Sequence, residues 1–231
     1  MNGPKQAPRI KVTKDGPVTV YGGVPLAREN IVADGDGEPE KWEKGPAYPD
    51  RDTYALCRCG ASKDKPFCDG SHIEAGFDGT ETANREGFLE RAERTSGPEL
   101  DLTWSAEICA ATCFCHRGEE AWGYAKRSDD PAARAAAVEE ACNCPSGSLV
   151  AWDKKTGAAI EPVLEPSIGL VEDPTSGTSG PIRVKGGIPV ESAEGVEYET
   201  RNRATLCRCG KSGNKPFCDG THVLTGFKSS V

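Results

Sequence analysis

The cysteine and histidine residues of this chain recur in two copies with the same spacing. Residues 57–72 read CRCGASKDKPFCDGSH and residues 207–222 read CRCGKSGNKPFCDGTH, so both follow the pattern C-x-C-x8-C-x3-H. Thiolate sulfur and imidazole nitrogen are metal ligands, and such strict spacing repeated within one chain predicts two metal sites. The candidate ligands are Cys57, Cys59, Cys68 and His72 in the first copy, and Cys207, Cys209, Cys218 and His222 in the second.

The spacing places the four donors of each copy in two pairs. Side chains two residues apart on an extended segment share a face, so Cys57 and Cys59 can bind one iron together. Cys68 and His72 stand at positions i and i+4, which share a face on a helical turn. Two such pairs suit a two-iron cluster, with one pair on each iron. The second copy repeats the arrangement, with Cys207 and Cys209 on one iron and Cys218 and His222 on the other.

The residues between these donors fit the same chemistry. Asp69 is a candidate N-cap for the helical turn that carries the histidine. Gly70 permits a close approach of the backbone, and Ser62 can donate a hydrogen bond to a sulfide. The N–H groups at the start of the turn would then point at an anionic cluster. The second copy has the equivalent residues Asp219, Gly220 and Ser212.

Both copies resemble the CDGSH iron-sulfur domain family, the mitoNEET-like proteins, whose signature is C-x-C-x2-[ST]-x3-P-x-C-D-G-[SAT]-H. The resemblance covers roughly residues 16–78 and 180–228. It implies one 2Fe-2S cluster per motif with three cysteine ligands and one histidine ligand. In this family two chains pair about a two-fold axis. We therefore expect the two copies to pair with each other, giving a monomer with internal pseudo-two-fold symmetry.

A structural zinc site with three cysteines and one histidine is the alternative for each motif. The pairing of the donors favours a cluster. Exchanging one thiolate for a neutral imidazole should raise the reduction potential, as in Rieske centres. It should also make the site sensitive to acid, because a ligating histidine must be neutral and protonation competes with iron.

A third group of cysteines lies between the two copies. Cys109 and Cys115 in a C-x5-C spacing, an alanine-rich helix and then Cys144-Pro145 resemble a divergent single-cluster ferredoxin domain of the 3Fe-4S or 4Fe-4S kind. Thr112 stands where a conventional 4Fe-4S loop has a cysteine. The fourth ligand would then be Cys113, Cys142 or His116, unless the cluster has three irons. The alternative is a relic domain that binds no metal.

The elements expected to position these residues give an α+β fold made mostly of small β units. We expect a flexible N-terminus at 1–15, a first CDGSH domain at 16–80, a ferredoxin-like α+β domain at 81–174, and a linker with the second CDGSH domain at 175–231. Paired Gly-Gly turns predict β-hairpins from residues 16 and 180, and residues 34–50 read as a solvated loop. The central region predicts a helix at 86–94, a strand at 100–108, a helix from Asp130-Pro131 and a strand at 149–152.

Composition narrows the class of function. The net charge of -8 argues against nucleic-acid binding, and no apolar run is long enough to predict a membrane span. The N-terminus has no signal-peptide pattern, so we expect the protein to act in the cytoplasm. In that reducing compartment, eleven cysteines predict metal ligation and not disulfides. No nucleophile elbow, phosphate loop or dinucleotide fingerprint predicts an enzyme.

We therefore expect an electron-transfer or cluster storage and transfer protein, which acts with a redox or cluster-acceptor protein. The alternatives are a pH- or redox-sensing regulatory module or subunit of a partner enzyme, and a structural zinc-binding protein.

Overall fold

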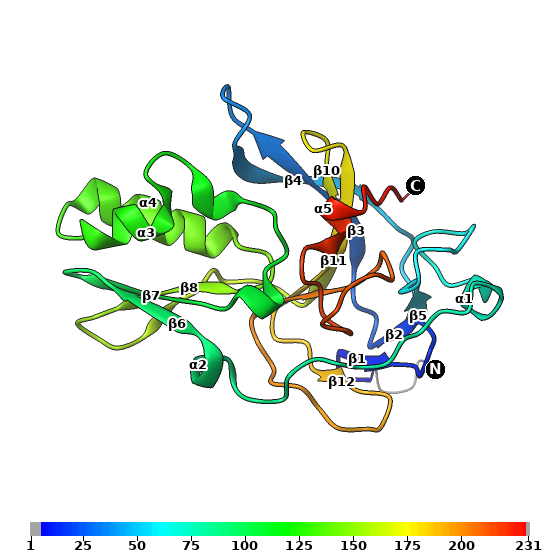
Figure 1. The fold of residues 1–231 in the computed structure, drawn as a ribbon. Helices are drawn as coiled ribbons and strands as arrows, with labels where there is room; N and C mark the ends of the chain where they lie inside the picture. The colour runs from blue at the N-terminus through cyan, green and yellow to red at the C-terminus, as the bar shows by residue number, and fades with distance from the viewer. Residues whose placement is uncertain (1–5, 230–231) are drawn as a thin grey trace.

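The computed structural model describes residues 6–229, so residues 1–5 of the expected flexible N-terminus lie outside the described part. The fold is α+β with short helices and three small sheets, as predicted (Figure 1). The first sheet has the order β12 (Val190–Glu191), β1 (Arg9–Val12), β2 (Val18–Tyr21), β5 (Thr53–Leu56). The second has the order β13 (Arg203–Leu206), β11 (Thr178–Lys185), β10 (Ser167–Asp173), β3 (Leu26–Ala33), β4 (Pro39–Ala47). The third has the order β6 (Glu93–Ser96), β7 (Leu100–Trp104), β8 (Leu149–Asp153), β9 (Ala159–Ile160).

The two sequence copies exchange a strand. β3 of the first copy pairs in parallel with β10 in the sheet of the second copy, and β12 of the second copy pairs in parallel with β1 in the sheet of the first. The orders β12-β1-β2-β5 and β3-β10-β11-β13 therefore match, with β4 as an addition at one edge. This reciprocal pairing gives the expected intramolecular pseudo-dimer.

The predicted Gly-Gly hairpins are wrong, because the strand after each turn joins the other sheet. β2 pairs with β1 and β5, and not with β3. Proline follows each turn and has no N–H to donate to a hairpin partner. The carbonyl groups of Pro25 and Pro189 instead accept hydrogen bonds from the other copy, from Ile168 at 2.8 Å and Ile10 at 2.8 Å.

One hydrophobic core serves both copies. Alternate residues of β1 and β2, such as Ile10 and Val20, are completely buried and pack in the same cluster as Ile182 and Leu206. Each such side chain contributes about 1.5–3 kcal/mol relative to exposure. The flexible N-terminus expected at 1–15 is therefore wrong for residues 9–12, because the alternation of buried residues in β1 fixes them in the sheet.

The central domain packs two helices on the third sheet. α3 (Glu120–Lys126) and α4 (Pro131–Asn143) cover one face of β7 and β8 (Figure 1). Asp130 caps α4 and accepts a hydrogen bond from the Ala132 N–H at 3.0 Å, as predicted. Small alanine side chains, including Ala137 and Ala141, allow the helix to approach Leu102 closely.

Two short elements differ from the expected helix at 86–94 and strand at 100–108. The first of these regions contains only the four-residue helix α2 (Phe88–Arg91), before β6 begins at Glu93. The second contains β7 and then a 3-10 turn, η1 (Ala106–Ile108). A second such turn, η2 (Phe114–His116), follows the central cysteine loop.

The segments expected to be loop and linker contain strands. Residues 39–47 form β4, which pairs with β3, although most of its residues are half-buried or exposed. Residues 178–185 form β11 and residues 167–173 form β10, so the second CDGSH unit begins before residue 175. Hydrogen bonding to the exchanged strand β3 explains why β10 belongs to this unit and not to the central domain.

Candidate metal centres

The first CDGSH site brings its four predicted donors together as two pairs. Cys57 follows β5 directly, and its Sγ lies 3.5 Å from the Sγ of Cys59. Cys68 precedes the helical turn α1 (Ser71–Glu74), and its Sγ lies 3.4 Å from Nδ1 of His72. Backbone hydrogen bonds hold the two arms, from Cys57 N–H to the Pro66 carbonyl and from Cys68 N–H to the Ala55 carbonyl.

The second site repeats this geometry. The Sγ atoms of Cys207 and Cys209 lie 3.6 Å apart, and Sγ of Cys218 lies 3.4 Å from Nδ1 of His222, on α5 (Thr221–Leu224). Within residues 6–229, no three histidine, cysteine or acidic side chains share a position that would hold one metal ion. The donors of each copy are thus arranged two by two, and this arrangement fits a pair of irons.

Several supporting residues act differently from the prediction. Asp69 is not the N-cap of α1. The N-cap is Gly70, which has a left-handed φ of 89° that glycine adopts without strain. The Asp69 carboxylate instead accepts hydrogen bonds from the Ser71 N–H at 3.0 Å and the Lys63 N–H at 2.8 Å, and these bonds lower its pKa. Ser62 donates to the Phe67 carbonyl at 2.7 Å and not to a sulfur. Asp219, Gly220 and Ser212 repeat these roles.

Sequence reasoning missed the arginine between the first two cysteines of each motif. Arg58 is 1% exposed and donates to the carbonyl groups of Gly16, Thr13 and Gly79. Arg208 donates to Gly180 and forms an ion pair with Glu172 at 2.7 Å. Each guanidinium is thus a buried positive charge held by backbone carbonyl groups of its own copy. The presence of arginine at the same position in both copies was the sequence signal that could have identified this residue.

Burial distinguishes the two sites. Cys218 is 2% exposed, His222 is 4% exposed and Cys209 is also buried. The corresponding Cys68, His72 and Cys59 of the first copy are only half-buried. The same motif is therefore covered in one copy and more open in the other.

The buried second site has strongly shifted acid-base properties. The hydrogen bond between the thiols of Cys207 and Cys209 lowers the pKa of Cys207 and raises that of Cys209. Burial raises the pKa of Cys218. Burial, reinforced by the positive charge of Arg208, lowers the pKa of His222 to about 4 and keeps the imidazole neutral, as a metal ligand must be.

The central domain gathers a third set of sulfur donors. Burial raises the pKa of Cys115, and the neighbouring charges of Cys144, Cys109 and Cys113 raise it further. The central cysteines are thus near enough for their charges to affect one another. Sγ of Cys144 lies 3.3 Å from the Ser148 hydroxyl, which helps to hold it toward the cysteine loop.

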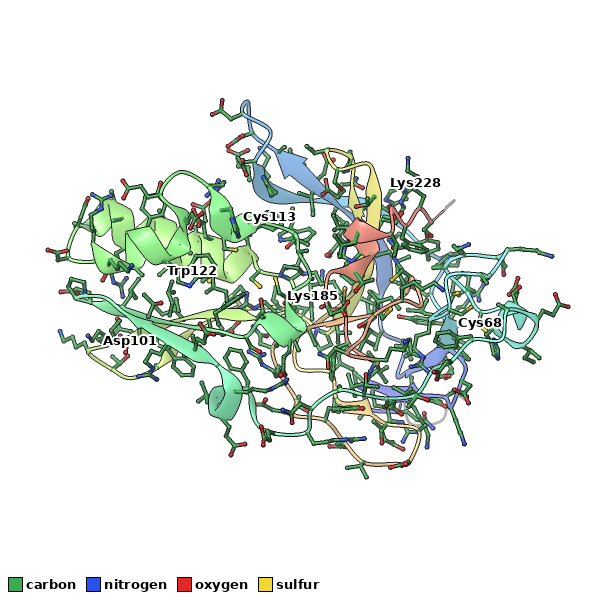
Figure 2. The ribbon with its side chains drawn as sticks, viewed as in Figure 1. Cys68, Asp101, Cys113, Trp122, Lys185 and Lys228 are labelled. Atoms are coloured by element: carbon green, nitrogen blue, oxygen red, sulfur yellow. The ribbon has the colours of Figure 1, made fainter. Side chains whose placement is uncertain are left out.

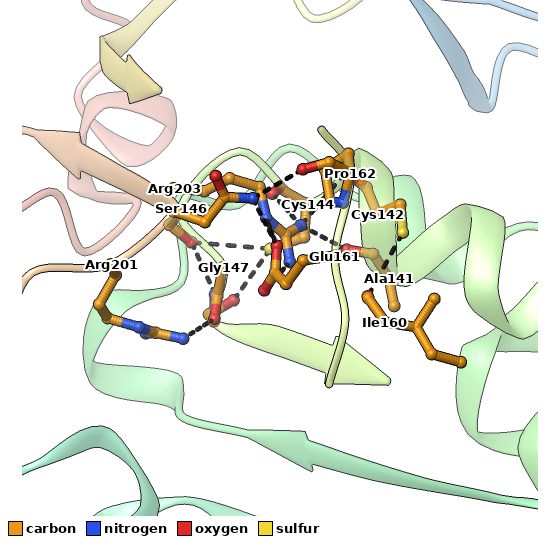
Figure 3. A network of polar contacts seen from close by, with 12 residues as sticks. Ala141, Cys142, Cys144, Ser146, Gly147, Ile160, Glu161, Pro162, Arg201 and Arg203 are labelled. Atoms are coloured by element: carbon orange, nitrogen blue, oxygen red, sulfur yellow. Dashed lines mark hydrogen bonds and ion pairs between the residues drawn. The ribbon is translucent and has the colours of Figure 1, made fainter. Parts of the chain in front are cut away.

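Two of the three candidates for the fourth central ligand point elsewhere. Sγ of Cys142 contacts the Ile160 carbonyl at 3.6 Å (Figure 3). The His116 ring faces Glu120 at 3.7 Å and packs edge-on against Trp122. Cys113 remains in the loop with Cys109 and Cys115. Its Sγ contacts the Ala111 carbonyl at 3.7 Å and the residue is exposed, so its place in the loop, and not its contacts, makes it the candidate for the fourth ligand.

Arg203 joins the second CDGSH unit to the central site (Figure 3). Its guanidinium donates to the carbonyl groups of Ala141, Cys142 and Cys144 at 2.6, 3.1 and 2.8 Å, and it pairs with Glu161 at 2.8 Å. Burial alone would raise the pKa of Cys144, but the Arg203 charge and the Ser148 hydrogen bond more than offset it and lower the pKa. The Cys144 thiolate is thus favoured where a metal would need it.

No helix within the described residues 6–229 has the length and apolar character needed to cross a bilayer.

Comparison with known families matches both ends and the centre of the chain. The family described as iron-binding zinc finger, CDGSH type, matches residues 15–73 and 179–223. The family described as divergent 4Fe-4S mono-cluster matches residues 95–154. Comparison with curated proteins and with solved structures gives no match. The chain is thus an iron-sulfur protein that carries two CDGSH regions flanking a divergent 4Fe-4S domain.

Proposed function

We propose that this iron-sulfur protein is an electron carrier that holds one 2Fe-2S cluster at each CDGSH motif and a further cluster in the central domain. The observation that carries the proposal is the two-by-two arrangement of donors in each motif. A single zinc ion requires four donors converging at about 2.0–2.3 Å. In each copy the donors instead meet as a cysteine pair and a cysteine-histidine pair, and no three of them converge on one position within residues 6–229.

The ligand residues are Cys57, Cys59, Cys68 and His72 in the first motif and Cys207, Cys209, Cys218 and His222 in the second. Cys109, Cys113, Cys115 and Cys144 serve the central site. A bound iron-sulfur cluster supplies reversible one-electron chemistry. The protein residues fix its position and tune its charge. The histidine ligands and the buried Arg58 and Arg208 both favour the reduced, more negative form of the CDGSH sites.

No catalytic role for the protein itself is proposed. Its reaction partners would be one-electron carrier proteins, and we place its action in the cytoplasm. Delivery of a cluster to an acceptor protein is the second candidate, favoured by the half-buried Cys68 and His72, which leave the first site more accessible.

Metal analysis and spectroscopy test the proposal directly. The purified chain should contain iron and acid-labile sulfide at two of each per CDGSH motif, plus those of the central site, and EPR of the reduced protein should show 2Fe-2S signals. Stoichiometric zinc without sulfide would contradict the assignment. Incubation with an apo-ferredoxin separates the two roles, because delivery transfers sulfide and iron, whereas electron carriage leaves both on the chain.

A further inference from the structure

We propose that the chain conducts electrons internally, from the central cysteine site to the second CDGSH site and on to the first, which is the end that meets the external acceptor. This inference rests on the proposed function, since all three sites must hold clusters. One electron enters from a one-electron donor protein at the central site and one leaves to a one-electron acceptor protein at the first CDGSH site. No bond forms or breaks.

The first step in this path is a direct contact between the central loop and the second motif. A Cβ atom built on Gly220 would lie 2.8 Å from Cβ of Ala111 and 3.4 Å from the carbonyl oxygen of Cys109. Gly220 lies between the ligands Cys218 and His222, and Ala111 follows Cys109 by two residues. The backbones that carry ligands of two different sites are thus in van der Waals contact.

The second step is a reciprocal contact between the two CDGSH motifs. A Cβ on Gly60 would lie 2.8 Å from the Cys209 carbonyl oxygen, and a Cβ on Gly210 would lie 2.5 Å from the Cys59 carbonyl oxygen. Both glycines have left-handed φ angles, 77° and 80°. A cleft of about 480 Å³ at this junction is lined by Cys59 and Cys209. Ligand-bearing backbones of the two motifs therefore touch as well.

Gly70 of the first motif does not make the contact that Gly220 makes with the central domain. Gly70 has the same left-handed conformation as Gly220, φ 89° against 84°, yet a Cβ there would meet nothing within 4 Å. Figure 1 shows α1 on the side of the molecule away from α3 and α4, whereas α5 lies between. Figure 2 likewise separates Cys68 from Cys113. The order of the three sites is therefore central, second, first.

Hydrogen bonds to the loop between Cys209 and Cys218 hold the second motif against residues on either side of the central domain's first strands. The Asn214 side chain donates to the Glu107 carbonyl at 2.7 Å, and Thr82 donates to the Gly213 carbonyl at 2.7 Å. The position equivalent to Asn214 in the first copy is Asp64, which is exposed. Tunnelling rates fall exponentially with distance, so a fixed contact between ligand loops favours transfer along this path over transfer to a distant site.

The ligand types set the direction. The central site offers four cysteines, whereas each CDGSH motif includes one neutral imidazole, which raises the reduction potential relative to an all-cysteine cluster. Electrons therefore pass from the central site toward the CDGSH motifs. The half-buried Cys68 and His72 then form the exit.

Stepwise reduction of the holoprotein followed by EPR tests the order of the sites. The CDGSH signals should appear first. When the central site is then reduced, spin-lattice relaxation should accelerate for about half of the CDGSH spins, those of the second motif. In Cys68→Ala, which lacks the first cluster, the acceleration should affect all remaining CDGSH spins. In Cys218→Ala it should be absent. Equal acceleration in both variants, or none in either, overturns the proposed electron path through the three sites.

A matched pair of glycine variants provides a second test that keeps all ligands. Gly70→Ala and Gly220→Ala carry the same backbone strain, but only the second places a methyl group against Ala111. The relaxation effect should weaken in Gly220→Ala and stay unchanged in Gly70→Ala. An unchanged effect in both overturns the proposed contact. Clusters absent from the wild-type CDGSH motifs would overturn the proposed function as well, whereas clusters present without central coupling would overturn the proposed electron path alone.

Discussion

Replacing Arg203 should destabilise the junction between the second CDGSH unit and the central domain. The residue is 1% exposed, and its guanidinium donates to three carbonyl groups at the end of α4 while pairing with Glu161. In Arg203→Ala the Cys142 carbonyl loses its donor, at about 1–3 kcal/mol, whereas the carbonyl groups of Ala141 and Cys144 keep the N–H groups of Cys144 and Gly147 at 3.2 and 3.4 Å. Such losses are not additive, and removal of one partner of a buried pair costs about 3–5 kcal/mol. We expect a loss of about 4 kcal/mol.

Urea denaturation of the holoprotein, followed by tryptophan fluorescence, measures this loss. Trp104, Trp122 and Trp152 all lie in the central domain and report its unfolding. With a denaturant slope of about 2–3 kcal/mol per molar urea, the unfolding midpoint should fall by about 1.3–2 M. Arg203→Lys should lose less, because one ammonium keeps the charge but not the forked set of donors.

Arg127 supplies the matched control. Its ion pair with Glu119 is half-exposed on both sides, so Arg127→Ala should cost less than about 1 kcal/mol. The reasoning would be refuted if Arg203→Ala lost no more stability than Arg127→Ala. It would also be refuted if Arg203→Lys matched Arg203→Ala, because the network of three carbonyl acceptors would then contribute nothing.

Two further predictions concern groups outside the ligand sets. Burial raises the pKa of Glu140 to about 7, and the side chain is 1% exposed. A carboxyl group whose folded pKa is raised contributes stability below its unfolded pKa of about 4.5, and that contribution is lost as the pH rises through 7. Glu140→Gln should therefore leave thermal stability unchanged at pH 4.5 and raise it at pH 8, by up to about 3 kcal/mol at one pKa unit per 1.36 kcal/mol. Equal effects at both pH values would contradict the assignment. Trp42 on β4 donates to the Asn143 carbonyl at 3.1 Å and stacks on Phe114 at 4.8 Å. Trp42→Ala should cost about 2–3 kcal/mol and speed amide hydrogen exchange in β3 and β4, whereas protection equal to wild type would show that the hairpin is held elsewhere.

The chemistry of the CDGSH motifs was predictable because it depends on local spacing. Cys57 with Cys59, and Cys68 with His72, are separated by only two and four residues, so each pair is brought together locally, by the bend after β5 and by the left-handed Gly70 before α1. The cap of α4 at Asp130 was predictable for the same reason, since its hydrogen bond closes within two residues. These features need no knowledge of the rest of the fold.

The strand exchange was not predictable from local signals. Gly22-Gly23 allows a tight hairpin, and only the following Pro25 indicates that β3 leaves its own sheet. The Pro25 carbonyl then accepts a hydrogen bond from β10, more than 130 residues away in the sequence. Every residue has a backbone carbonyl group, so the sequence does not indicate this partner. β1 was missed because four residues with two buried side chains, Ile10 and Val12, give too short an alternation. When tertiary packing decides which strands pair, the local sequence does not predict the partner.

The non-equivalence of the two motifs could not be read from their sequences either, and it explains why the two copies occupy one chain. Gly70 and Gly220 share one backbone conformation, yet only Gly220 meets Ala111. A symmetric dimer of single-motif chains must expose both sites to the same surroundings. A single chain with one central domain between its copies can cover the second site and leave the first open. In the electron path proposed above, that asymmetry makes the second site the entrance to the pair and the first site its exit.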